Sequence, residues 1–264
     1  MSVTEELLFG VENGVATITL NRPEKRNSFT DEMVQRWVGL LDDCALRDDV
    51  RVIVFAAADG AFSSGGDTSG LAEKAKQTPL QAKERMMANT QRLTRKVFEI
   101  DKPIIAAVNG AAVGGGMDLA LMCDVRLASE KARFAETYAK MGLVPGVGGS
   151  WLLPRIIGQS AALDMFWTSR WVDAQEALSL GIVTRVFAEE TFRDGVRAYA
   201  EQIAAGAPNS IRYIKRLVAQ GLTTDIHTHL DTLSSHLALI RTGEDHKEAV
   251  AAFREKRAPK FTGS

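Results

Sequence analysis

The stretch GAAVGGGMDLALMCD, residues 110–124, places four glycines just ahead of one carboxylate, Asp118, in an apolar run. Glycine lets a backbone approach a ligand closely, and the first amides of a helix have no partner within that helix. Such amides favour an oxygen atom that carries or develops negative charge. The stretch therefore predicts a loop that binds such an oxygen, followed by a helix that begins near Asp118.

A second glycine loop, AFSSGGD at residues 61–67, also follows a predicted buried strand. If each loop supplies one N–H group to the same oxygen, the two loops form an oxyanion hole from main-chain atoms. Tight packing at a strand–helix junction requires the same glycines, so that alternative stays open for either loop alone. No G-x-G-x-x-G follows the first strand and no Walker A pattern occurs, which argues against a dinucleotide or phosphate site.

Other reactive side chains lack the partners that their chemistry needs. All four histidines fall in the helical tail, and the two in the H-x-H motif would point apart on a helix, so we expect no metal site. Ser63 and Ser64 have no placed base, and no G-x-S-x-G elbow is present. The net charge of −1 and the single short basic run at residues 212–216 predict no nucleic-acid partner.

The elements that position these residues follow from hydrophobic spacing. Residues 6–20 predict a hairpin turned by Asn-Gly, and residues 30–49 and 79–99 have helical periodicity. Strands and helices alternate from about residue 50 to residue 186, which is typical of β-β-α or β-α units. Four helical segments without a strand follow residue 189. We therefore predict a core of residues 1–188 and a helical region of residues 189–264.

Composition limits the class of protein further. The chain has 264 residues, of which 45% are hydrophobic and 25% charged, as in an ordinary globular protein. Its N-terminus lacks the basic and apolar regions of a signal peptide, and two cysteines cannot build a disulfide framework, so we expect a cytoplasmic location. The apolar stretch from Pro103 is broken by Asn, Asp and Gly and is too short to span a membrane.

Five ordered segments resemble the crotonase family, the enoyl-CoA hydratase/isomerase superfamily, and together they cover nearly the whole chain. They are LNRPEKRNSF, AFSSGGD, KPIIAAVNGAAVGGGMDLALMCDVRLAS, ARFAETYAKMGLVPGVGGSWLLPRIIG and FREKRAPKF, of which the third is the most specific. The resemblance implies an α/β fold, a crotonase-type spiral of β-β-α units with a C-terminal helical trimerisation region. It also implies a homotrimer or a dimer of trimers.

The resemblance further implies a coenzyme A thioester as the substrate, with CoA as part of that substrate and no separate cofactor. The backbone N–H groups of Ser64 and Gly115 would form the oxyanion hole. The CoA moiety would contact a group of residues in the first loops. A second group, in the C-terminal signature, would reach the CoA of a neighbouring subunit. These residues are Lys25, Arg26, Ala61, Phe62 and Asp67, and then Phe253 and Lys256.

The chain departs from the family at its acids. The hydratases of the family use two glutamates, and this chain has Asp118 at the first position and Tyr138 at the second. Tyrosine is a poor base at neutral pH, although it can donate a hydrogen bond or a proton. Glu136 would share a face with Tyr138 if the segment is extended, and would pair with Lys140 if it is helical. The sequence leaves both alternatives open.

We therefore expect an enzyme of the enoyl-CoA hydratase/isomerase type that acts on acyl-CoA thioesters in fatty acid metabolism. Asp118 is expected to transfer the proton. Tyr138 and Glu136 are the other candidate catalytic residues. The reaction is expected to be double-bond isomerisation or another single-base reaction, hydration, or a rarer reaction of the family. Because the second glutamate is missing, an alternative stays open: the protein is a non-catalytic homologue that binds CoA esters, acts as a scaffold or binds RNA. Contacts to the acyl group are expected from residues 71–87.

Overall fold

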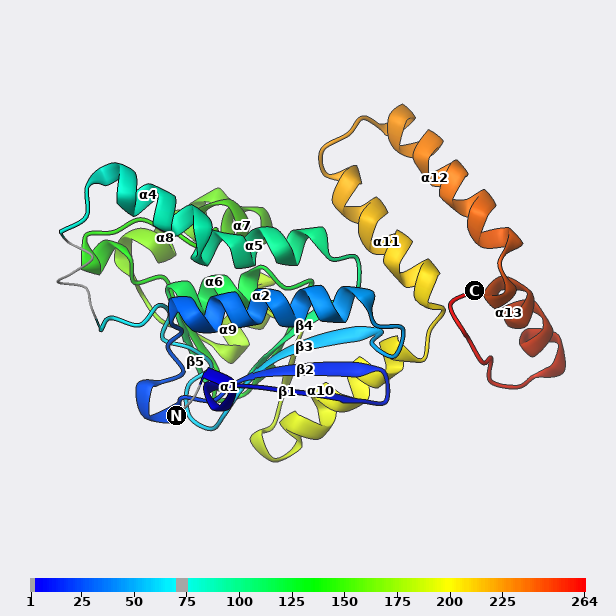
Figure 1. Cartoon of the computed structure of the whole chain (residues 1–264), viewed down its shortest axis with the longest axis horizontal. Helices are drawn as coiled ribbons and strands as arrows, with labels where there is room; N and C mark the ends of the chain where they lie inside the picture. The colour runs from blue at the N-terminus through cyan, green and yellow to red at the C-terminus, as the bar shows by residue number, and fades with distance from the viewer. Residues whose placement is uncertain (1–2, 70–75) are drawn as a thin grey trace.

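The computed structural model describes residues 3–69 and 76–264, in which two sheets are surrounded by helices (Figure 1). The larger sheet has the strand order β1-β2-β3-β4-β6-β9, and the smaller has the order β5-β7-β8. The strands are β1 (Leu7–Glu12), β2 (Val15–Leu20), β3 (Val52–Ala57), β4 (Ile104–Val108), β5 (Ala111–Val113), β6 (Val125–Ser129), β7 (Arg133–Ala135), β8 (Val172–Asp173) and β9 (Arg185–Phe187).

Helices connect these strands and form the C-terminal part of the chain. The α-helices are α1 (Val3–Glu6), α2 (Asp31–Leu46), α4 (Pro79–Ala88), α5 (Thr90–Glu99), α6 (Gly115–Leu121), α7 (Gly149–Ile157), α8 (Gln159–Thr168), α9 (Ala174–Leu180), α10 (Glu189–Ala204), α11 (Pro208–Gly221), α12 (Ile226–Thr242) and α13 (Glu244–Glu255). Two short 3₁₀ helices, η1 (Pro23–Lys25) and η2 (Ala139–Met141), complete the described elements. None of the described helices is long and apolar enough to cross a membrane.

The predicted hairpin is confirmed, because β1 and β2 pair in antiparallel register from Leu7 opposite Leu20 to Glu12 opposite Val15. Asn13 and Gly14 turn the chain with φ angles of 50° and 80°. A tight hairpin turn requires this left-handed conformation at both central residues, and Asn-Gly is the dipeptide that adopts it most easily.

The β-β-α repeat is also confirmed. β4 joins the large sheet, β5 joins the small sheet, and α6 follows directly; β6 and β7 repeat this division before α7. β4 pairs in parallel with β6, and β5 pairs in parallel with β7. Each unit therefore delivers the end of a strand and the start of a helix to the same region of the molecule.

Successive side chains of a strand point to opposite faces of the sheet. Helices cover both faces of the large sheet. One face packs with α2 and α6, where Trp37 meets Phe55 edge to face at a ring distance of 4.7 Å. Helix α2 begins with Thr30, whose side chain accepts a hydrogen bond from the N–H of Met33. The other face packs against α10.

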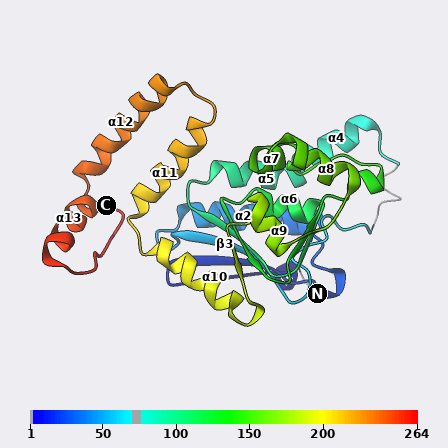
Figure 2. The ribbon, with the colours of Figure 1, turned by 180° about the vertical axis from the view of Figure 1, so that it is seen from behind.

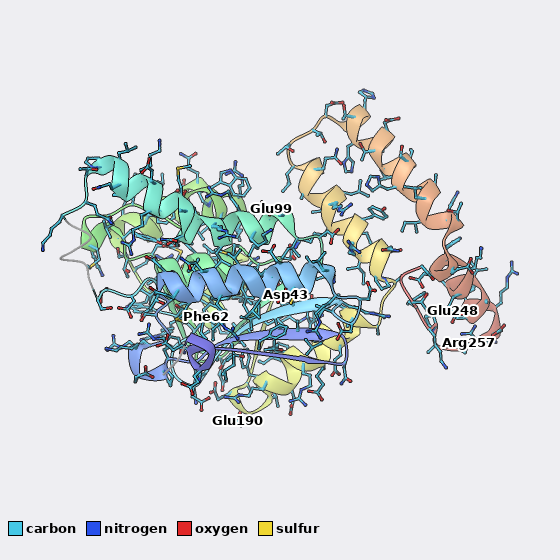
Figure 3. The ribbon with its side chains drawn as sticks, in the orientation of Figure 1. Asp43, Phe62, Glu99, Glu190, Glu248 and Arg257 are labelled. Carbon is cyan, nitrogen blue, oxygen red and sulfur yellow. The ribbon has the colours of Figure 1, made fainter. Side chains whose placement is uncertain are left out.

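This packing changes the boundary predicted at residue 189. Helix α10, expected in a separate helical region, buries Phe192, Val196 and Ala200 against the sheet. The helices α11, α12 and α13 extend away from the core (Figures 1 and 2). Figure 3 places Glu248 and Arg257 together at the far end of this extension. The change from core to extension therefore lies after α10.

The single helix predicted over residues 79–99 is two helices. Asn89 breaks it, with φ −110° and ψ −94°, and α5 begins at the next residue. Helix α4 buries none of its side chains. The segment 71–87, expected to contact the acyl group, lies partly outside the described residues, and its described part ends in this exposed helix.

Gly116 on α6 provides a test of how the two glycine loops pack. A Cβ atom at Gly116 would lie 2.1 Å from the carbonyl oxygen of Ser63, so the loops would have to separate. We expect Gly116→Ala to lower the free energy of unfolding by about 1–3 kcal/mol in urea titrations. Gly39, exposed on α2 with open space around it, is the matched control. Gly39→Ala should raise stability by about 0.5–1 kcal/mol, and equal effects of the two changes would refute the packing argument.

Candidate active site

Asn27 holds the first glycine loop in place. Its side chain is fully buried, its Nδ2 donates to the carbonyl of Ala61 at 2.6 Å, and its Oδ1 accepts from the N–H of Arg22 at 2.8 Å. The hydroxyl of Ser63 donates to the carbonyl of Asn27 at 2.8 Å. Sequence reasoning missed Asn27, although an amide in a polar loop between two turns is suited to bonding several backbone groups at once.

Ser64 does not have the free amide that the sequence analysis assigned to it. The amides of this loop are bonded in turn, Ser63 to Ala111 O (3.1 Å), Ser64 to Arg26 O (3.0 Å), Gly65 to Ser63 Oγ (3.1 Å) and Asp67 to Phe29 O (2.9 Å). The Ser64 prediction is therefore corrected, because an N–H that donates to the protein is not available to a ligand. From Ser63 to Asp67 the N–H of Gly66 is the one with no acceptor among the described residues, and Gly66 is exposed.

The second glycine loop supplies an amide of the same kind. Gly114, with φ 50°, bonds its N–H to the carbonyl of Ala135 at 2.8 Å and turns the chain into α6. Gly115 is the first residue of α6, and its N–H has no acceptor in the part of the chain that the structure describes. A Cβ at Gly65 would lie 3.2 Å from the nitrogen of Gly115, so the two loops touch backbone to backbone.

The side chains of Asp118, Glu136 and Tyr138 lie together near the start of α6. Asp118, on the first turn of α6, is fully buried, and Tyr138 donates its hydroxyl to Asp118 Oδ2 at 2.7 Å. Glu136 is fully buried directly after β7, and its carboxyl group lies beside that of Asp118, because a Cβ at Gly149 would touch both Asp118 Oδ1 and Glu136 Oε1. The segment is extended at Glu136, and Lys140 instead donates to the carbonyl of Ser169. The alternative of a helical pair between Glu136 and Lys140 is therefore wrong.

The start of α7 closes the site around the two carboxyl groups. A Cβ at Gly149 would lie 2.0 Å from Asp118 Oδ1 and 3.2 Å from Glu136 Oε1. Both acids therefore reach the same point on the α7 backbone, and only glycine leaves room for them. The amides of Gly149 and Val147 face Asp118 and stabilise its negative charge.

Burial dominates the titration of these groups. It raises the pKa of Asp118 to about 6, although hydrogen bonds from Tyr138, Glu136 and the α7 amides oppose the shift. Burial, together with the negative charge of Asp118, raises the pKa of Glu136 to about 10. Burial and the same charge also raise the pKa of Tyr138. At neutral pH the carboxyl pair therefore holds one proton between its two groups.

The residues predicted to contact CoA are not all brought together. Lys25 and Arg26 are exposed at η1, close in sequence to the first loop. The ring of Phe62 is fully buried, in the body of the molecule in Figure 3, which leaves only its main chain for a ligand. Ala61, beside it, uses its carbonyl to anchor Asn27.

The remaining predicted contacts have other roles or lie elsewhere. The carboxylate of Asp67 bonds to Arg22 at 2.8 Å, and despite burial, hydrogen bonds from Ser69 and Arg22 lower the pKa of Asp67 to about 2. Phe253 is 86% exposed on α13, and Lys256 ends that helix in the left-handed conformation. Both lie on the extension, far from η1 in the same chain (Figure 1).

A cavity of about 380 Å³ opens beside Gly66, between the start of α2 and α4. Its lining includes Phe29, Asp67 and Arg85. A larger hollow of about 680 Å³ lies between the sheet and α10, on the face opposite α6. Only the smaller one adjoins the free amide of the first loop.

Parallel strands, two touching glycine loops and a buried pair of carboxyl groups together define an α/β protein with a candidate site at the start of α6. A family model described as enoyl-CoA hydratase/isomerase matches residues 10–264. The chain therefore belongs to the enoyl-CoA hydratase/isomerase family, in the crotonase superfamily, and is an enzyme of that family. The predicted crotonase-type fold is confirmed.

Individual relatives agree with this assignment over nearly their full length. The chain is 38% identical to (E)-benzylidenesuccinyl-CoA hydratase of Thauera aromatica, covering 96% of this chain and 98% of that protein. It is 33% identical to 1,2-epoxyphenylacetyl-CoA isomerase of Escherichia coli K12, covering 98% and 99%. The crystal structure of enoyl-CoA hydratase from Bacillus anthracis superposes with a TM-score of 0.91 at 30% identity, covering 98% and 100%.

The raised pKa of Glu136 predicts how stability depends on pH. Between its ordinary value of 4.5 and about 10, the folded protein holds a proton that the unfolded chain releases. The contribution of Glu136 to the free energy of unfolding is therefore fully present below about pH 4.5. As the pH rises towards about 10, this contribution falls by up to about 1.4 kcal/mol per pH unit.

Glu136→Gln removes this dependence because an amide does not ionise. Urea titrations at pH 6 and pH 9, at one protein concentration, should measure this effect. The free energy of unfolding of the variant, relative to that of the wild type, should be higher at pH 9 than at pH 6. A constant difference between the two proteins at both pH values would mean that Glu136 is not protonated in the folded state.

Proposed function

We propose that this enzyme binds an acyl-CoA thioester and stabilises its enolate with the amides of Gly66 and Gly115. One observation carries the proposal: in the two touching loops, the N–H groups of both residues lack internal acceptors among the described residues. Removal of an α-proton places negative charge on the thioester oxygen. Two N–H groups directed at that oxygen lower the barrier, and the loss of one such donor typically costs on the order of 10²–10³ in rate.

Asp118 is the proposed base. Its carboxylate takes the proton from the α-carbon, C2, of a 3-enoyl thioester, and the electrons move onto the oxygen held by the two amides. Asp118 then returns the proton at C4, so the double bond moves to C2–C3 and no atom is gained or lost. Tyr138 donates to Oδ2 throughout and leaves Oδ1 facing Glu136 and α7.

Isomerisation is favoured over hydration by the residue at position 138. Addition of water requires one group to activate the water and another to protonate the α-carbon, and Tyr138 replaces the second glutamate of the hydratases. The relatives include both a hydratase, named for (E)-benzylidenesuccinyl-CoA, and an isomerase, named for 1,2-epoxyphenylacetyl-CoA.

The helical extension supports a trimer, as the family resemblance implies. Its exposed apolar side chains include Ile214, Val218, Leu222, Leu239 and Phe253, and a monomer would leave this surface in water. In a trimer, Phe253 and Lys256 would reach the CoA of a neighbouring subunit. CoA enters as part of the substrate, and the proposed chemistry needs no separate cofactor.

The experiment is an assay with crotonyl-CoA and with a 3-enoyl-CoA, following absorbance of the conjugated thioester. We expect absorbance to rise with the 3-enoyl substrate, and hydration would instead lower it with crotonyl-CoA. Gly66→Pro removes the N–H and should lower kcat/KM by about 10²–10³. Gly66→Ala keeps the N–H, has open space for its Cβ, and should lose far less.

Two results would count against the proposal. If the Pro and Ala variants lost the same activity, the Gly66 amide would have no part in the reaction. If neither substrate changed absorbance while CoA esters still bound, a non-catalytic binding role would be favoured.

A further inference from the structure

Glu136 has no counterpart in the two-glutamate pattern of the hydratases, yet it is among the most enclosed acids of the molecule. Its side chain is fully buried, and both carboxyl oxygens lack any conventional donor among the described residues. Its nearest acidic neighbour is Asp118, whose Oδ1 also lacks a hydrogen-bond partner among the described residues, and a Cβ at Gly149 would touch both Asp118 Oδ1 and Glu136 Oε1. Two ionised carboxylates buried this close together without a cation are strongly unfavourable, so the pair holds a proton.

We propose that Glu136 is a positioning residue that stays protonated through the reaction and donates its proton to Asp118 Oδ1, holding Asp118 as the ionised base. The inference rests on the proposed function, in which Asp118 removes the α-proton. Tyr138 donates to the other oxygen at 2.7 Å, so the two neutral donors fix the plane of the Asp118 carboxylate from both sides. Gly149 fixes the distance, because any larger residue would push the two carboxyl groups apart.

The competing role for Glu136 is that of a second ionised base, replacing the missing glutamate. Three elements face this acid: α6 with Asp118, the start of α7 with its amides, and the segment with Tyr138. The charged group that acts on Glu136 is Asp118, and no described lysine, arginine or histidine offsets it. A second negative charge at full burial, beside the first and without a cation, is strongly unfavourable.

Two substitutions separate these roles. Glu136→Gln keeps the size and a donor but cannot act as a base, and Glu136→Leu removes the donor. We expect the Gln variant to retain most of kcat/KM and the Leu variant to lose about 10- to 100-fold, as for a hydrogen bond to a charged group. In the profile of kcat/KM against pH, the acid limb should stay in place in the Gln variant and move to higher pH in the Leu variant.

A readout independent of turnover distinguishes this inference from the proposed function. Infrared spectra of the wild type at pH 7 should contain the carbonyl band of a protonated carboxylic acid, and Glu136→Gln should lack it. Asp118→Asn, the control, should lose activity and keep the band. The inference is overturned if the Gln variant loses as much activity as the Leu variant, or if the wild type shows no such band, whether or not the Leu variant folds.

Discussion

The site depends on the contact of two loop backbones without side chains between them. The atoms of Gly65 lie against the nitrogen of Gly115, and the carbonyl of Ser63 lies where a Cβ of Gly116 would be. This contact places the loop after β3 against the loop after β5, so that Gly66 and Gly115 belong to touching loops. In the proposed mechanism both donors are main-chain groups, so the fold itself would keep them in position while charge develops on the substrate.

The second constraint is the burial of two acids side by side. Asp118 comes from α6, Glu136 follows β7, and the start of α7 closes the space around both. A low-dielectric site makes each donor to Asp118 stronger and makes a second charge very unfavourable. The same burial that keeps Glu136 neutral therefore leaves Asp118 as the group able to ionise near neutral pH. The cost of this arrangement should appear as a loss of stability at high pH.

Much of this could be predicted from the sequence, because periodicity and turn chemistry are local. The hairpin and the β-β-α repeat follow from spacing alone, whereas the amide of Ser64, expected to be free, is bonded to the carbonyl of Arg26. That error has a physical reason: whether an N–H is free depends on Arg26, far away in the chain, whose carbonyl accepts it. The partners of Glu136 and the packing of α10 on the sheet were likewise decided by tertiary contacts that no local pattern contains.

The central claim is that the amides of Gly66 and Gly115 bind the thioester oxygen together. A crystal structure of the enzyme with an unreactive acyl-CoA thioester tests it most directly. The account predicts that the thioester oxygen lies about 2.7–3.1 Å from both nitrogens, with the α-carbon facing Asp118. A well-defined ligand whose thioester oxygen lies beyond hydrogen-bonding distance of either nitrogen would contradict it.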